Sequence, residues 1–162
     1  MSQEKVYFQD YMPENVCFGC GSNNHQGLKI KSYWQDQTAI SIWNSEEKYH
    51  GWANLLNGGV IATLMDCHSM CTAMAYAYKQ ENRGLRTEPI YRYATGTMNI
   101  KYLKPTSNNK PVEIHAVVKE VKDRKTILQC DLFSEGIKTV TAEITAIRVF
   151  DSSKDKEGNP FI

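Results

Sequence analysis

One carboxylate stands out in this 162-residue sequence because of what surrounds it. Asp66 lies in a stretch of small and apolar residues that begins with Asn57, Gly58 and Gly59. A helix N-terminus presents free N–H groups and a partial positive charge, which polarise a carbonyl. A carboxylate can act on such a carbonyl as a base or as a nucleophile. These positions therefore predict an acyl-transfer site, with the carboxylate about two turns beyond Gly59.

Residues 57–78 are predicted to form the helix that positions this site. Asn57 is a preferred N-cap residue, and apolar side chains recur at helical spacing until near Lys79. The face that holds Asp66 is made of small residues rather than Lys, Glu or Gln, so we expect it to be covered. A buried carboxylate is costly unless it is hydrogen-bonded or used. Mid-helix aspartates are also commonly solvated, so the pattern alone leaves a merely structural Asp66 open.

The rest of the chain is predicted to form strands. Before the helix, Leu28–Trp34 and Thr38–Trp43 alternate as a hairpin. After it, strands starting near Thr95, Val112, Thr126 and Ile137 are separated by short turns, which join antiparallel neighbours. The four apolar side chains expected to face inward from the first hairpin are Leu28, Ile30, Ile40 and Ile42.

This element order predicts an α+β fold in which an antiparallel β-sheet wraps around one long central helix. The length suits one domain over residues 1–162, with a core at about 17–150. The formal net charge of +1 gives no field that would attract nucleic acid or an acidic membrane. We find neither a membrane-spanning apolar segment nor the apolar core of a signal peptide. Five cysteines without a disulfide spacing pattern favour a cytoplasmic location.

The cysteines also raise the question of a metal. Cys17 and Cys20 have ligand spacing, and His25 follows closely. A structural zinc site takes four ligands, and the sequence indicates no second pair, so we predict no metal. Cys67 and Cys71 are interpreted as small core residues of the helix.

Two segments, together with the element order, carry a family resemblance. The segment from His50 to Asp66 contains the Gly-Gly pair, a short apolar run and the aspartate, and Thr95 to Pro105 ends in an apolar-basic-Pro tip. The loop Cys17 to Leu28 adds Cys-Phe-Gly-Cys-Gly and Asn-x-x-Gly-Leu. The chain resembles the hotdog-fold acyl-CoA thioesterases, in particular the phenylacetate-pathway-type branch of the 4-hydroxybenzoyl-CoA thioesterase superfamily.

The resemblance implies roles for individual residues. Asp66 matches the catalytic base or nucleophile, and Gly58 and Gly59 match the backbone that holds the thioester carbonyl. Thr95 matches a hydroxyl that helps to place the carboxylate or water and is expected from a partner subunit. Asn57 stands where the family usually has His, so it can cap the helix but cannot act as a charged donor. Relatives carry an upstream residue that orients water or substrate, and the nearest candidates for this substrate-binding role here are His50 and Asn54. Lys101 and Lys104 are expected either to meet the coenzyme A phosphates or to be solvated charges at a sheet edge.

The implied function is hydrolysis of an acyl-CoA thioester to free acid and coenzyme A. Coenzyme A would enter as part of the substrate, with no other cofactor. The implied assembly is a homodimer, or a homotetramer formed as a dimer of dimers. Because Asn57 replaces the usual His of the family, a second hypothesis stays open. It is a non-catalytic acyl-CoA-binding or regulatory hotdog domain. A hotdog dehydratase is less favoured, since those enzymes pair an acidic residue with a His.

Overall fold

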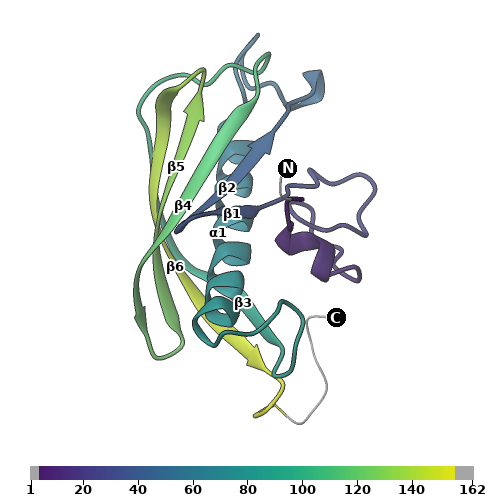
Figure 1. The fold of residues 1–162 in the computed structure, drawn as a ribbon. Coiled ribbons are helices and arrows are strands. Elements are labelled where there is room, and N and C mark those ends of the chain that lie inside the picture. Colours follow the sequence, from purple (N-terminus) through teal and green to yellow (C-terminus); the bar gives the residue numbers. More distant parts are fainter. Residues whose placement is uncertain (1–3, 156–162) are drawn as a thin grey trace.

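The computed structural model describes residues 4–155, in which one long helix lies across one face of a six-stranded antiparallel sheet (Figure 1). The strand order is β1-β2-β4-β5-β6-β3. The predicted α+β arrangement of a sheet around one helix is therefore confirmed. The elements are the 3₁₀ helices Phe8–Tyr11 (η1) and Glu47–Tyr49 (η2), the helix Gly58–Gln80 (α1), and the strands Tyr33–Gln35 (β1), Thr38–Trp43 (β2), Tyr91–Tyr102 (β3), Val112–Lys122 (β4), Lys125–Ser134 (β5) and Ile137–Asp151 (β6).

The start of α1 is fixed by its cap, as the sequence predicts. The Asn57 side-chain oxygen accepts from the Gly59 N–H at 2.8 Å and from the Val60 N–H at 3.1 Å. The backbone oxygen of Asn57 accepts from Ile61 N–H at 3.0 Å, which is the first intrahelical bond. Such a cap typically stabilises a helix by about 1 kcal/mol.

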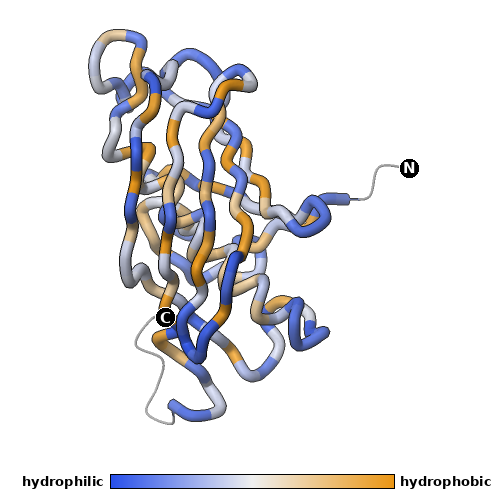
Figure 2. Tube along the Cα trace, turned by 90° about the vertical axis from the view of Figure 1, so that its left-hand side faces the viewer, coloured by the Kyte–Doolittle hydropathy of each residue, from blue (hydrophilic) through white to orange (hydrophobic). Residues whose placement is uncertain are grey.

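Two layers bury α1, the sheet on one side and the N-terminal segment 4–32 on the other (Figure 1). Leu64 and Met65 of the helix are fully buried, as are Ile114, Leu128 and Ile144 of the sheet. Figure 2 views the molecule from the sheet side, where hydrophobic and hydrophilic residues alternate along the strands. That alternation places one set of side chains on the helix and leaves the other set on the outer face.

A buried polar network ties these layers together around His68. Its Nε2 lies 3.0 Å from the carbonyl oxygen of Ala39 in β2, and its Nδ1 lies 2.8 Å from Ser32 Oγ. Gln9 Nε2 donates to the same Ser32 oxygen at 3.0 Å, and Gln9 Oε1 accepts from Ser32 N–H at 2.7 Å. His68 is therefore a fully buried histidine whose two ring nitrogens both have hydrogen-bond partners.

The predicted inward face of the first hairpin is partly wrong. Leu28, Ile30 and Ile40 are buried, but Ile42 is 51% exposed. Successive strand residues face opposite sides, and Trp43 is the one that packs inward, with its Nε1–H donating to Leu28 O at 2.8 Å. Apolar residues of both parities occur in β2, so alternation alone could not decide its phase. The first strand is also shorter than predicted, since β1 covers only Tyr33–Gln35.

The predicted single domain over residues 1–162 extends beyond the described residues at both ends and stays a prediction. Within residues 4–155, no helix is long and apolar enough to cross a membrane.

Candidate functional site

Asp66 and Thr95 form the centre of the candidate site. Asp66 is half-buried in the middle of α1, and the Thr95 hydroxyl of β3 donates to its Oδ1. The expectation that this hydroxyl comes from a partner subunit is wrong, because the contact is made within one chain. The hydrogen bond fixes the orientation of the carboxylate and leaves its other oxygen for a substrate or water.

A bulge in β3 aims Thr95 at the helix. Thr95 pairs with Ala146 and Thr97 with Thr145, so Gly96 is an extra residue between them. A Cβ on Gly96 would lie 2.6 Å from Ile147 Cδ1 and 3.2 Å from the Thr145 carbonyl oxygen, so a larger residue here would require Ile147 to move. A bulge bends the strand locally and re-aims a side chain. The exposure of β3 fits its place at the sheet edge.

Burial shifts the titration of the Asp66 carboxyl. Loss of water raises its pKa, the Thr95 hydrogen bond lowers it in part, and the nearby Cys20 raises it again, with a net increase. Burial disfavours the charged form, whereas the hydroxyl donor stabilises it. A carboxylate whose pKa is raised is a stronger base than a solvated one.

The small-residue face around Asp66 is less covered than the sequence suggests. Gly59 is exposed, and Ala62, Thr63 and Met70 are half-buried. Ser69 and Ala73, further along this face, are buried. In a single chain, therefore, the end of this face nearest the helix N-terminus stays open, and the carboxylate can be approached from solvent.

The helix N-terminus differs from the expected carbonyl-binding arrangement. Gly58 and Gly59 do form its first turn, but the Gly59 N–H is already donated to the Asn57 side chain. Among the described residues, no acceptor faces the Gly58 N–H. Gly58 is therefore the amide that the first turn offers to a ligand.

A mostly apolar groove of about 620 Å³ opens beside this amide. Trp52, Tyr102 and Lys104 line it together with Asn57 and Gly58. Trp52 is 83% exposed, and Tyr102 donates its hydroxyl to Gly58 O at 2.6 Å. No local sequence pattern indicates a role for Tyr102, because its contact with the helix spans 44 residues of chain. Lys104 is the one expected coenzyme A contact that lies in this groove.

The other expected substrate-binding residues lie elsewhere. His50 and Asn54 line a separate polar pocket of about 440 Å³. The Asn54 side chain there accepts from Asn109 at 3.1 Å, and its φ of 66° places it in a tight turn. Lys101 points to the outer face of the sheet, beside Gln129, Thr141 and Glu143. The structure thus groups Asp66 with Thr95, and it groups Asn57 and Gly58 with Lys104. The remaining expected residues, His50, Asn54 and Lys101, belong to neither group.

A family comparison decides how this arrangement is classified. Residues 53–141, more than half of the chain, match the model of the thioesterase superfamily. The chain belongs to the thioesterase superfamily. No curated relative matches it. The match spans the helix N-terminus, Asp66, Thr95 and Lys104.

Solved structures place this superfamily member in the hotdog fold, as expected. A thioesterase superfamily protein from Shewanella loihica PV-4 is 28% identical, with a TM-score of 0.61 over 75% of this chain and 91% of that chain. A hypothetical thioesterase from Streptococcus pneumoniae TIGR4, solved with coenzyme A, is 14% identical, with a TM-score of 0.59 over 72% and 85%. The Escherichia coli PaaI protein from the phenylacetic acid degradation operon is 10% identical, with a TM-score of 0.62 over 76% and 82%.

The fold brings one further thiol to the cysteine loop. The sequence indicates no second ligand pair near Cys17 and Cys20, but Cys67 of α1 lies beside both. Cys67 and Cys71 are indeed buried, as predicted for core residues.

Proposed function

We propose that this thioesterase-superfamily chain hydrolyses acyl-CoA thioesters to the free acid and coenzyme A. The observation that carries the proposal is the Asp66 carboxylate, half-buried in mid-helix and oriented by Thr95. Superfamily membership supports thioester hydrolysis in general. The coenzyme A bound to the Streptococcus pneumoniae protein of the same fold supports a CoA ester as the first substrate to test.

The chemistry requires a proton acceptor and a polarised carbonyl. With Asp66 as general base, water adds to the thioester carbon while its proton moves to the carboxylate. The tetrahedral intermediate then breaks the carbon–sulfur bond and expels the coenzyme A thiolate, which takes up a proton. With Asp66 as nucleophile, an acyl-aspartate anhydride forms first, and water hydrolyses it. Both routes use the oxygen that Thr95 leaves free.

The carbonyl donor for Asp66 should come from a second copy of the chain. Gly58 lies eight residues before Asp66, which corresponds to about 12 Å along the helix axis. A thioester carbonyl bonded to the Gly58 N–H of one chain is therefore too far from the carboxylate of that chain. Two copies with antiparallel helices would bring each Gly58 to the other Asp66. The open small-residue face supports such a dimer, and tetramers would be dimers of these dimers.

The groove at the helix N-terminus suits the rest of the substrate. Its apolar walls, including Trp52, can accept an acyl or pantetheine chain, and Lys104 at its rim can pair with a phosphate. The nature of the acyl group depends on what the second copy adds to this groove.

The test is turnover of short-chain, long-chain and aromatic acyl-CoAs, with product acid and coenzyme A separated by chromatography. Asp66→Asn should lower kcat by about 10²-fold or more, the scale of a lost general base. It should keep or raise the melting temperature, because it removes a buried charge. Asp123→Asn, in the exposed turn between β4 and β5, is the matched control and should retain full turnover. Wild-type turnover by Asp66→Asn would refute the catalytic assignment.

One observation favours a second candidate, a non-catalytic acyl-CoA-binding domain. The Asn57 side chain occupies the Gly59 N–H, where the family resemblance implies a thioester carbonyl. Binding of acyl-CoAs by calorimetry without turnover of any of them would favour this candidate over hydrolysis.

A further inference from the structure

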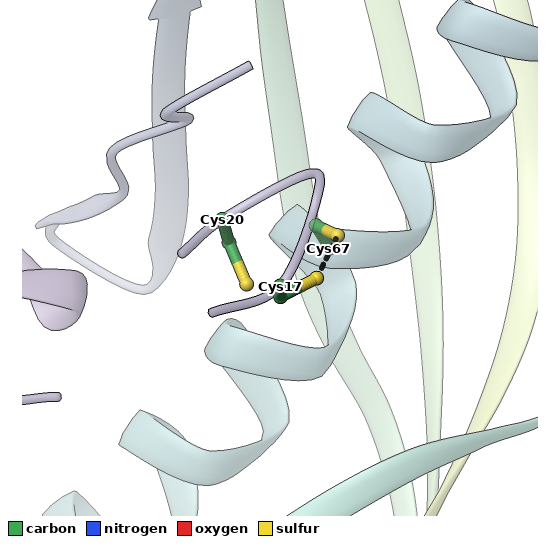
Figure 3. A group of neighbouring side chains, drawn as sticks. All are labelled: Cys17, Cys20 and Cys67. Carbon is green, nitrogen blue, oxygen red and sulfur yellow. Dashed lines mark hydrogen bonds between the residues drawn. The ribbon is translucent and has the colours of Figure 1, made fainter. Parts of the chain in front are cut away.

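Three thiols meet where the N-terminal segment crosses α1 (Figure 3). The sulfur atoms of Cys17, Cys20 and Cys67 all lie within 4.8 Å of one another. Cys17 Sγ lies 3.7 Å from Cys67 Sγ, and all three cysteines are free. A tetrahedral ion with metal–sulfur bonds of about 2.3 Å separates its ligand sulfurs by about 3.8 Å. The Cys17–Cys67 separation is therefore close to that of two thiolates on one ion.

A fourth thiol adjoins this group from the helix. Cys71 follows Cys67 by one turn on the same side of α1 and is buried. Its sulfur is not one of the three that lie within 4.8 Å of one another, so Cys71 sits beside the group rather than in it. Two ligands four residues apart on a helix face can bind one ion, as the two His of a zinc-binding helix do. With the Cys71 side chain turned toward the other three sulfurs, the loop pair and the helix pair would supply the four ligands of a Cys₄ site.

The loop is shaped to bring its pair onto the helix. A Cβ on Gly19 would lie 2.3 Å from Cys67 Sγ, so only glycine allows this approach. A Cβ on Gly21 would lie 2.5 Å from the backbone of Cys17, and Gly21 N–H donates to Cys17 O at 2.8 Å. Asn15 donates its side-chain N–H to Cys20 Sγ at 3.3 Å, a contact that orients the sulfur and would stabilise it as a thiolate.

We propose that Cys17, Cys20, Cys67 and Cys71 bind one structural zinc ion that clamps the N-terminal segment onto α1. Zinc suits four soft sulfur ligands in tetrahedral geometry. On binding, the ion forms four zinc–sulfur bonds and the four thiols release four protons to solvent. Cys17 is exposed, so the ion can enter from its side, whereas the other three ligands are buried. One ligand of this zinc site, Cys67, is next to Asp66 in the sequence. The proposed zinc site does not depend on a catalytic role of Asp66.

The first test measures metal in the full chain purified without added metal. Atomic emission should give about one zinc per chain, and replacement by Co²⁺ should produce the visible absorption of a tetrahedral thiolate complex. Removal of zinc should lower the melting temperature by about 5–10 °C, and one equivalent of Zn²⁺, but not Mg²⁺, should restore it. Zinc-free protein whose melting temperature and thiol reactivity do not respond to added Zn²⁺ would overturn the proposal. So would iron in place of zinc, or a Cys17–Cys67 disulfide found by mass spectrometry under non-reducing conditions.

The second test assigns the ligands by substitution. Cys17→Ala, on the exposed loop, and Cys71→Ala, in the helix, should each lower zinc affinity by about 10²-fold or more, while Cys130→Ala serves as the matched control. Cys130 is free and fully buried in β5, so its removal leaves a similar space without touching the cluster. The control should keep full zinc occupancy. Undiminished zinc binding by Cys71→Ala would overturn the four-thiol site. If Cys130→Ala lost as much zinc as the ligand variants, the assignment of the ligands would be overturned. The Zn²⁺ titration of the metal-free wild-type chain decides the matter if either ligand variant does not fold.

Discussion

The buried His68 should lower the stability of the folded protein in mild acid. This loss adds to that from the other titrating groups of the chain. The carbonyl oxygen of Ala39 can only accept a hydrogen bond, so His68 Nε2 carries the ring hydrogen and Nδ1 accepts from the Ser32 hydroxyl. Protonation of Nδ1 would set a second donor against Ser32 Oγ, which already accepts from Gln9. The hydroxyl hydrogen would then lose its buried partner, which is unfavourable.

The size of this loss of stability follows from the pKa of the His68 imidazole. Burial lowers the pKa of His68 from 6.5 to about 4, the Ala39 carbonyl opposes this in part, and the charge of His115 adds to it. Because the folded pKa is the lower one, the unfolded chain binds the extra proton between these two values. Stability is therefore complete above about pH 6.5, falls as the pH decreases, and stops changing below about pH 4. The loss attributable to His68 is about 3 kcal/mol in all and about 2 kcal/mol between pH 7 and pH 5.

The assay compares thermal unfolding at pH 7 and pH 5 for the wild type and for His68→Gln. A glutamine can donate to the Ala39 carbonyl but does not titrate. The variant is expected to be less stable at pH 7, yet to lose roughly 4–8 °C less in melting temperature on going to pH 5. His115→Gln, a half-exposed histidine on β4, serves as the control and should retain most of the wild-type pH dependence. If His68→Gln and the wild type lose the same stability between pH 7 and pH 5, the conclusion that His68 is buried in its neutral form is refuted.

Three further predictions concern the candidate site and its assembly. Thr95→Val should lower kcat by roughly 10-fold. The acidic limb of the pH profile of kcat should move to higher pH, because the hydroxyl that lowers the Asp66 pKa is gone. An unchanged acidic limb would contradict the Thr95–Asp66 hydrogen bond. Asn57→His should preserve the fold and keep or raise turnover, since it frees the Gly59 N–H; collapse of steady-state activity would give Asn57 a role of its own. Light scattering should give at least a dimer, and a mass of about 18.5 kDa at micromolar concentration would count against a shared active site.

The sequence was sufficient to predict an element wherever its local residue pattern fits only one structure. The cap at Asn57 and the helical spacing to Lys79 predict α1 almost as it is, from Gly58 to Gln80. Where the pattern allowed two solutions, packing decided, as when Trp43 rather than Ile42 turned inward in β2.

Contacts between distant segments could not be predicted in this way. Cys17 and Cys67 are separated by 50 residues, and each cysteine pair has an ordinary explanation by itself. Tyr102 reaches Gly58 only because β3 ends beside the helix N-terminus. Asp66 was identifiable from its unusual surroundings on the helix, whereas its partner Thr95 required the family resemblance, and the fold corrected which chain supplies it.

Three consecutive residues of α1 show how closely the site and the fold are connected. A helix turns by about 100° per residue, so Asp66, Cys67 and His68 point in three different directions. Asp66 contacts Thr95 of β3, Cys67 contacts Cys17 of the N-terminal segment, and His68 contacts Ala39 of β2. The angular position of the candidate catalytic carboxylate is therefore determined from two other sides of the helix. Insertion of one residue before Asp66 would rotate all three side chains away from their partners, so the orientation of α1 cannot change without loss of the buried histidine network and the thiol cluster together.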